Sequence, residues 1–212
     1  LPEPLHGILE DGLNSLSVAA SPRLIQNLLR YIELLEHWNQ RINLTAVRKP
    51  EDMVVRHLLD ALSIAPHVTQ SNLVDIGSGA GLPGIPMALL NSGQQWHLVD
   101  SSGKRVSFLR EVVRQLDLKN VQVSHSRIEE FHPVERFPAA IARAFASLGE
   151  IADNASHLLL PEATLWAMKG RYPQAELADL PANFRLVKVL PLEVPGLSED
   201  RHLVQLSFNP ET

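Results

Sequence analysis

The chain has 212 residues, of which 45% are hydrophobic and 20% are charged, and this length is enough to bury the core of one α/β domain with a smaller appendage. Because it contains no cysteine, disulfides, thiolate metal sites and cysteine nucleophiles are excluded. The formal net charge of −5 argues against a protein that coats nucleic acid without specificity, although a local basic face could still hold one folded RNA.

The first residues carry no sign of export or of membrane insertion. The opening run LPEPLHGILEDG lacks the basic and apolar blocks of a secretory signal. No run in the sequence approaches the roughly 18 to 20 apolar residues that span a bilayer. We therefore expect a cytoplasmic protein without a membrane partner, and we interpret Leu1 as the sign of a trimmed N terminus.

Two amphipathic helices are predicted in the first part of the chain. Ser21 as N-cap and Pro22 at the first helical position begin a helix that runs to Trp38. A second helical pattern covers about 51–65. Since no strand pattern precedes residue 70, we assign residues 1–70 to an N-terminal helical extension.

Short β-rich runs alternate with helical patterns in the remainder of the chain. The runs are NLVDI, WHLVD, VQVSH, AAIARA and ATLWAM, and the helical patterns lie near 83–91, 102–117 and 147–160. This alternation predicts a parallel sheet with crossover helices. The last two runs, at 184–190 and 202–208, have no helix between them and should pair antiparallel. We expect residues 71–212 to form an α/β domain of the Rossmann-like class I methyltransferase type, with a seven-stranded, mostly parallel sheet and an antiparallel last strand.

A glycine-rich loop, DIGSGAGLPG, follows the first predicted strand. Gly77, Gly79 and Gly81 would let the backbone turn sharply and approach a ligand such as S-adenosylmethionine. Gly79, Gly81 and Gly84 also fit the dinucleotide fingerprint G-x-G-x-x-G. Asp100 lies near the distance at which that fingerprint places a ribose contact. An NAD-dependent oxidoreductase is therefore a rival interpretation, and a tight turn without a ligand is another.

Two features of the loop favour the methyl donor. The Asp75 carboxylate at the end of the first strand would repel a pyrophosphate, whereas it suits the ammonium or sulfonium charge of S-adenosylmethionine. Pro83 and Pro86 remove backbone N–H donors at the start of the next helix, which a pyrophosphate would need. We therefore expect S-adenosylmethionine as the cofactor.

The ends of the next two strands carry further candidates for the same pocket. Asp100 ends the second strand, where a carboxylate can accept both hydroxyls of a ribose or can instead cap the following helix. After the third strand, Ile128 and Glu129 stand where an adenine edge should lie, and Ile128 offers apolar contact to the ring.

Eight segments spread over nearly the whole chain carry a more specific pattern. They are HWNQRINLTAV at 37–47, VRHLLDAL at 55–62, DIGSGAGLPGIP at 75–86, LVDSSGKRVSFLR at 98–110, SRIEEF at 126–131, RAFASL at 143–148, MKG at 168–170 and DRHLV at 200–204. In this order they resemble the RsmG (GidB) family of bacterial 16S ribosomal RNA guanine-N7 methyltransferases. Two of the segments lie outside any generic methyltransferase motif.

The resemblance implies both a cofactor pocket and a substrate. It implies contacts to S-adenosylmethionine from Gly77, Leu82, Ile128, Glu129 and Arg143, with support from Asp75 and Asp100. It also implies that the substrate is a guanine in the 530 loop of 16S ribosomal RNA, at position 527 in the family, met within the assembled small ribosomal subunit. We expect the protein to act as a monomer.

The side chains that other methyl acceptors need are missing from the sequence. Carbon-5 of a pyrimidine requires a cysteine nucleophile. The Asn/Asp/Ser-Pro-Pro-aromatic run of amino-group methylation is replaced by RAFASL, and no aspartate ends the fourth strand to serve a ribose hydroxyl. Guanine N7 presents a lone pair without a proton, so its methylation needs no general base. We expect no catalytic residue as such, but alignment of the reactants by Arg143 and the cofactor pocket.

Basic residues are predicted at strand ends and in the loops that follow them. They are Lys104, Arg105, Lys169, Arg171, Arg201 and His202. We expect several of them to converge on one rim around the cofactor mouth and bind RNA, and Arg143 could serve both the cofactor and a phosphate. No histidine and carboxylate have a spacing that suggests a metal. An RNA-binding ribosome-assembly module with a vestigial nucleotide pocket remains an alternative function.

Overall fold

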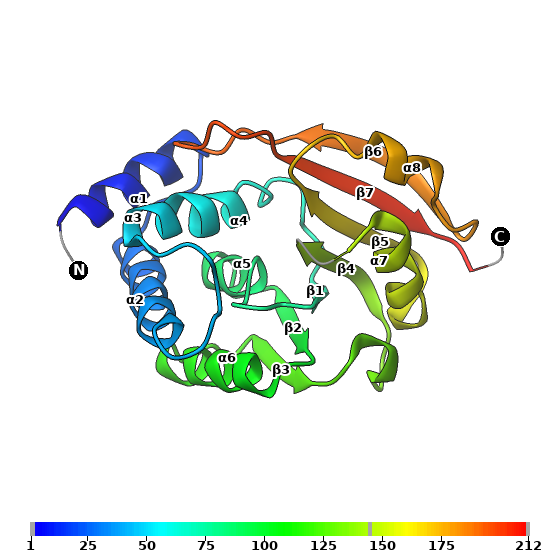
Figure 1. Cartoon of the computed structure of the whole chain (residues 1–212), viewed down its shortest axis with the longest axis horizontal. Coiled ribbons are helices and arrows are strands. Elements are labelled where there is room, and N and C mark those ends of the chain that lie inside the picture. The colour runs from blue at the N-terminus through cyan, green and yellow to red at the C-terminus, as the bar shows by residue number, and fades with distance from the viewer. Residues whose placement is uncertain (1–2, 144–145, 211–212) are drawn as a thin grey trace.

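Seven strands form one sheet in the computed structural model, which describes residues 3–143 and 146–210 (Figure 1). In chain order the strands are β1 (Asn72–Ile76), β2 (Gln95–Asp100), β3 (Val121–His125), β4 (Phe137–Arg143), β5 (Leu159–Lys169), β6 (Phe184–Pro191) and β7 (His202–Phe208). Their order across the sheet is β3-β2-β1-β4-β5-β7-β6. The predicted seven strands are therefore confirmed.

The sheet is parallel from β3 to β5 and antiparallel at β7. β7 lies between β5 and β6 and pairs antiparallel with both. The predicted antiparallel pairing of the last two strands is thus confirmed, because the link between them is too short for a helical crossover. As a result, the carboxyl ends of β1 to β5 and the first residue of β7 lie along one edge of the sheet.

Helices cover both faces of the sheet (Figure 1). α5 (Gly84–Leu90) and α6 (Gly103–Gln115) belong to the hydrophobic cluster that contains Leu73 of β1. α7 (Leu148–Ala155) belongs to a second cluster, on the opposite face, which contains Val74. Successive residues of a strand point to opposite faces, so a strand covered on both sides is apolar throughout. Short elements complete this part of the chain: η2 (Ile128–Glu130), η3 (Ser156–Leu158) and α8 (Gln174–Ala178).

The helix expected over 147–160 is shorter in the structure. α7 ends at Ala155, and β5 already begins at Leu159. A short apolar run fits a helix or a strand equally well by periodicity, and here the pairing of Leu159 with Phe137 of β4 favours the strand. α8 was not predicted, because its five residues are too few to display a helical period.

Two N-terminal helices pack on the face that α5 and α6 cover. α2 (Pro22–Asn39) begins as predicted, since the Ser21 hydroxyl accepts a hydrogen bond from the Leu24 N–H at 3.2 Å. α1 (Glu3–Ser15) is not among the predicted helices, because glycines interrupt its apolar stripe of Leu5, Leu9 and Leu13.

The second predicted helix is a continuous stretch with a π-helical centre. It consists of α3 (Pro50–Met53), η1 (Val54–Leu59) and α4 (Asp60–Leu62), and we refer to it as helix 50–62. A π-helical turn is rare and is frequently found at functional sites. Helix 50–62 lies beside the link between β6 and β7, where the Cβ of a residue replacing Gly196 would lie 3.3 Å from a Val55 methyl group.

The N-terminal helices and the sheet share one hydrophobic cluster. The N-terminal helices and the sheet therefore do not have separate cores. The division into an extension (1–70) and a methyltransferase domain (71–212) stays a prediction about how the sequence is organised. Within the described ranges, no helix is both long and apolar enough to cross a membrane.

Candidate cofactor site

The carboxyl ends of β1, β2 and β3 surround a cavity of about 340 Å³, a volume within the usual range for small-molecule sites. It is lined by Gly77, Val99, Asp100, Ser101, Arg105, Ser126, Arg127, Ile128 and Glu129. Four residues predicted to hold a cofactor are thus brought together: Gly77, Asp100, Ile128 and Glu129. The remaining five predicted residues are not part of this lining; they are Asp75, Gly79, Gly81, Leu82 and Arg143.

The glycine loop adopts the sharp turn that its sequence predicts. Gly77, Gly79 and Gly81 have φ angles of 65°, 59° and 89°, in the left-handed region that favours glycine. At Gly81 a Cβ would also lie 2.6 Å from a side-chain carbon of Ile85 and 2.8 Å from one of Leu109. The loop therefore needs glycine both for its conformation and for its packing.

Hydrogen bonds within the protein occupy most N–H groups of this loop. Gly77 and Ser78 donate to Val99 O, Gly79 to Asp100 Oδ2, Gly81 and Leu82 to Ser78 O, Gly84 to Asp75 Oδ2, and Ile85 to Gly81 O. Pro83 and Pro86 have no N–H to offer. A pyrophosphate at the start of α5 would thus find its usual N–H donors already bonded. These hydrogen bonds are direct evidence against dinucleotide binding, whereas the sequence provided only the positions of Asp75 and the prolines.

Asp100 joins the cavity to the glycine loop. Its side chain is 3% exposed, and its two oxygens accept hydrogen bonds at 2.8 Å from the N–H groups of Gly79 and Ser102. Arg105 Nη1 lies 3.6 Å from Oδ2. A carboxylate can accept about four hydrogen bonds, so the bonds at the start of α6 leave capacity for the two hydroxyls of a ribose. The N-cap of α6 is Ser102, so the alternative role of Asp100 as the N-cap residue is wrong, whereas a ribose contact is compatible with this geometry.

Asp75 lies beneath the loop. It is fully buried; Oδ2 accepts a hydrogen bond from the Gly84 N–H at 3.0 Å, and Oδ1 has no hydrogen-bond partner. Burial raises the pKa of this carboxyl to about 8, against the opposing effects of the Gly84 N–H and Arg143. With this pKa the carboxyl group is mostly protonated, and so uncharged, at neutral pH. An uncharged Asp75 does not repel a pyrophosphate, so the bonded N–H groups of the loop, and not the charge of Asp75, disfavour a dinucleotide.

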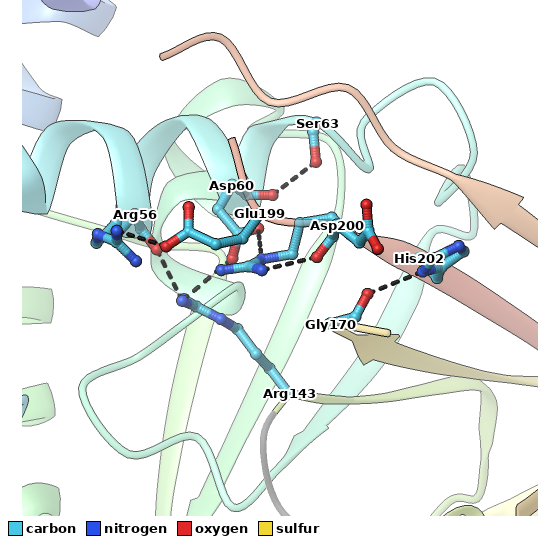
Figure 2. Close-up of polar contacts among 9 residues, drawn as sticks. Arg56, Asp60, Ser63, Arg143, Gly170, Glu199, Asp200 and His202 are labelled. Carbon is cyan, nitrogen blue, oxygen red and sulfur yellow. Dashed lines mark hydrogen bonds and ion pairs between the residues drawn. The ribbon is translucent and has the colours of Figure 1, made fainter. Parts of the chain in front are cut away.

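Arg143, at the end of β4, is held by helix 50–62 (Figure 2). Its Nη2 lies 3.1 Å from Asp60 Oδ2 and donates to the Arg56 carbonyl at 2.8 Å. Its Nη1 is buried without a hydrogen-bond partner. The other oxygen of Asp60 accepts a hydrogen bond from Arg201 Nε at 3.0 Å. Asp60 was missed from the sequence, although a carboxylate on the apolar stripe formed by Leu59 and its neighbours is a signal of a buried ion pair.

His57 stands one turn before Asp60 and is buried. Its Nε2 lies 2.8 Å from Thr45 Oγ1, and its Nδ1 has no partner. Burial and the nearby charge of Arg143 lower the pKa of this imidazole to about 4, so the ring is neutral at physiological pH. His57 thereby anchors the loop between α2 and helix 50–62.

The predicted RNA-binding residues fall into two groups, not on one rim. Lys104 and Arg105 are exposed at the start of α6, and Arg105 lines the cavity. Arg171 and His202 lie at the end of β5 and the start of β7, where Nδ1 of His202 is 2.8 Å from Gly170 O. The two groups are separated because β1, β4 and β5 lie between β2 and β7.

Two of the predicted RNA contacts are bonded within the protein. Lys169 Nζ lies 2.7 Å from both Ala146 O and a Glu176 carboxylate oxygen, and its side chain is only 15% exposed. Arg201 is paired with Asp60. By contrast Arg127, which was not predicted, is exposed at the cavity and follows a strand end in the same way as the other candidates.

The RAFASL segment is described only in part, because Ala144 and Phe145 lie outside the described residues. Ser147 of this segment caps α7 through a capping box with Glu150. A larger cavity of about 1000 Å³ lies between α1, α2 and α6, away from these strand ends. Among the side chains that the structure describes, no group of three or more His, Asp or Glu could hold a metal ion.

Comparisons with known proteins agree with this architecture. The family described as rRNA small subunit methyltransferase G (GidB) matches residues 24–204. Ribosomal RNA small subunit methyltransferase G of Stenotrophomonas maltophilia (strain K279a) is 47% identical over 207 residues, which cover 98% of this chain and 97% of that protein. The protein of the same name from Nitrosococcus oceani is 45% identical over 201 residues, covering 95% and 94%.

A solved structure supports the fold independently. The glycopeptide N-methyltransferase MtfA superposes with a TM-score of 0.61 at 12% identity, covering 74% of this chain and 99% of that chain. At this identity the likeness bears on the fold alone. It confirms the predicted Rossmann-like class I methyltransferase fold.

Proposed function

The chain belongs to the rRNA small subunit methyltransferase G family, and from this premise we propose that it transfers a methyl group from S-adenosylmethionine to N7 of a guanine in 16S ribosomal RNA. We assign the target to the 530 loop, and the substrate to the assembled small subunit. The enzyme acts in the cytoplasm as a monomer. The target loop and the subunit follow from the resemblance of the eight segments.

The observation that carries the cofactor assignment is the cavity at the ends of β1, β2 and β3. Its polar group suited to a ribose is Asp100, and its apolar wall suited to an adenine is Ile128, with Glu129 beside it. Most N–H groups of the adjoining loop are bonded within the protein, which disfavours a pyrophosphate. A nucleoside without a pyrophosphate, such as the adenosine part of S-adenosylmethionine, fits this combination.

Arg143 is the residue that would hold the other end of the cofactor. Its buried Nη1 lacks a partner, and an unpaired buried donor costs free energy unless a ligand satisfies it. A guanidinium binds carboxylates and phosphates alike, and the burial of Nη1 favours a group on a small cofactor over the backbone of a folded RNA. We therefore assign Arg143 to the carboxylate of S-adenosylmethionine rather than to an RNA phosphate.

The proposed chemistry requires positioning rather than proton transfer. S-adenosylmethionine supplies an electrophilic methyl group on a sulfonium. Guanine N7 attacks it with a lone pair and has no proton to lose, so no side chain needs to act as a base. The protein then accelerates the reaction by holding acceptor and donor in line, an effect worth up to about 7–11 kcal/mol in favourable cases.

The exposed cations on either side of the cavity are the proposed RNA contacts. Lys104, Arg105 and Arg127 flank it on the β2–β3 side, and Arg171 lies after β5. Because the net charge of the chain is −5, RNA binding depends on these local groups rather than on the field of the whole protein.

A binding experiment with a turnover arm tests the proposal. S-adenosylmethionine and NAD are titrated calorimetrically into the wild type and into Gly77→Asp, which places a charged side chain at a left-handed residue of the cavity. We expect the wild type to bind S-adenosylmethionine and not NAD, and we expect Gly77→Asp to weaken binding by at least about tenfold. Gly7→Asp in α1, where a Cβ meets nothing within 4 Å, is the matched control and should bind normally.

The turnover arm separates the alternatives. Methyl-labelled S-adenosylmethionine is supplied with small subunits that lack their methylations, and label in 16S RNA is measured. Binding without transfer would favour a ribosome-assembly module, and NAD binding without affinity for S-adenosylmethionine would favour an oxidoreductase. Either result would overturn the proposed function.

A further inference from the structure

Helix 50–62 carries one carboxylate that connects three parts of the molecule. Asp60 is 1% exposed, and each of its oxygens contacts a different arginine. Arg143 lies at the end of β4 (Figure 2). Arg201 is the residue immediately before β7. A buried charge is retained only where partners compensate its desolvation, so this arrangement fixes both guanidinium groups relative to the helix.

Contacts near Asp60 hold helix 50–62 against the link between β6 and β7. Arg56, one turn earlier, pairs with Glu199 at 2.6 Å, and Gly196 packs closely against Val55. Arg201 is thereby held by a segment that is itself docked on the helix. The π-helical turn ends immediately before Asp60.

These contacts hold the guanidinium group of Arg143 in one orientation. Its Nη2 is used by Asp60 and by the Arg56 carbonyl, while Nη1 stays buried and free of hydrogen bonds. A long arginine side chain loses much rotamer freedom when it is fixed in this way, and that cost is met before any ligand arrives.

We propose that Asp60 is a positioning residue for methyl transfer: it aims Nη1 of Arg143 at the cofactor carboxylate and links that contact, through Arg201, to the β6–β7 link. This inference rests on the proposed function, because it assumes that Arg143 binds S-adenosylmethionine. It adds a residue that does not touch the cofactor and acts through another side chain.

Asp60→Asn tests the inference through binding, independently of turnover. The variant keeps the size of the side chain and one acceptor oxygen but removes the charge, so one arginine loses its partner. We expect the dissociation constant of S-adenosylmethionine to rise by about 10- to 100-fold, the range by which loss of a group that orients a metal ligand weakens metal binding. Calorimetry well below the melting temperature measures it.

A double-mutant cycle distinguishes positioning from general stability. If Asp60 acts through Arg143, Asp60→Asn should change the affinity by less than about twofold in an Arg143→Met background. Glu111→Gln is the matched control, because it breaks an exposed ion pair on α6 that takes no part in holding helix 50–62 against the β6–β7 link. It should leave the affinity within about twofold of the wild type.

Each outcome has a definite meaning. Wild-type affinity in folded Asp60→Asn, even with a lowered melting temperature, would overturn the inference and leave the proposed function standing. An additive cycle would also overturn it. Absence of binding in the wild type would instead contradict the proposed function. Should Asp60→Asn not fold, Asp60→Glu, which keeps the charge and displaces it by one methylene, must show the same loss of affinity.

Discussion

Asp75 carries a carboxyl group that is fully buried at the foot of the glycine loop. Burial raises its pKa from 3.8 to about 8, although the Gly84 N–H and Arg143 oppose the change. Between these two values the folded protein holds a proton that the unfolded chain releases. The contribution of this group to stability is therefore complete below about pH 4 and is lost as the pH rises through about 8.

Asp75→Asn should flatten this dependence. Asparagine keeps an oxygen that accepts the Gly84 N–H but does not titrate. From about pH 5 to about pH 8, the free energy of unfolding of the wild type should fall relative to that of the variant by up to about 1.4 kcal/mol per pH unit, the value for one proton. Urea unfolding at a series of pH values measures the difference. Parallel curves for the two proteins would show that Asp75 does not titrate in this window.

Single residues were predictable from the sequence where backbone conformation or strand ends determine them. The glycines of the loop adopt the predicted sharp turn with left-handed φ angles, and Asp100 lies at the end of β2 as predicted. Asp60 and its two arginines could not be placed, because their contact joins segments 83 and 141 residues apart and depends on tertiary packing. A charge within an apolar helical stripe was the only available signal.

At the scale of elements, α2 connects the N-terminal extension to the cofactor loop. Tyr31 is fully buried in this helix and donates a hydrogen bond from its hydroxyl to the Ala80 carbonyl at 2.7 Å. Burial raises the pKa of the phenol well above its ordinary value of 10, so it remains a donor at any physiological pH. The extension thus supports the glycine loop directly.

Tyr31→Phe should destabilise the protein by about 1–3 kcal/mol, because it removes the donor to a buried carbonyl and leaves the ring in place. The affinity for S-adenosylmethionine should fall as well, since the loop loses its contact with α2. Chemical unfolding and calorimetry measure the two effects. Tyr172→Phe is the matched control, because Tyr172 is 49% exposed. Equal stability of the two variants would contradict a structural role for the Tyr31 hydroxyl.

Elements were predictable where their period was long and uninterrupted. The strands β1, β3 and β7 begin and end at the predicted residues, and Ser21 caps α2 as expected. α1 and α8 were not predicted, the first because glycines interrupt its stripe and the second because it is short. The π-helical turn in helix 50–62 has no sequence period of its own and follows from packing.

At the scale of the whole molecule, the strand order decides which residues can form one site. Parallel strands bring the glycine loop, Asp100 and Arg143 to the same edge, and this could be inferred from the alternation of elements. The positions of the basic residues around the site could not be inferred from the sequence, because they depend on the order β2-β1-β4-β5-β7 across the sheet. Lys104 and Arg171 therefore lie on opposite sides of the site, where they could contact separate parts of a folded RNA.

The most direct measurement identifies the methylated atom. Small ribosomal subunits lacking their methylations are incubated with the protein and methyl-labelled S-adenosylmethionine, and the 16S RNA is digested to nucleosides and separated. We predict that the label appears as 7-methylguanosine. Label in any other nucleoside, or no label from a protein that binds the cofactor, would contradict the account.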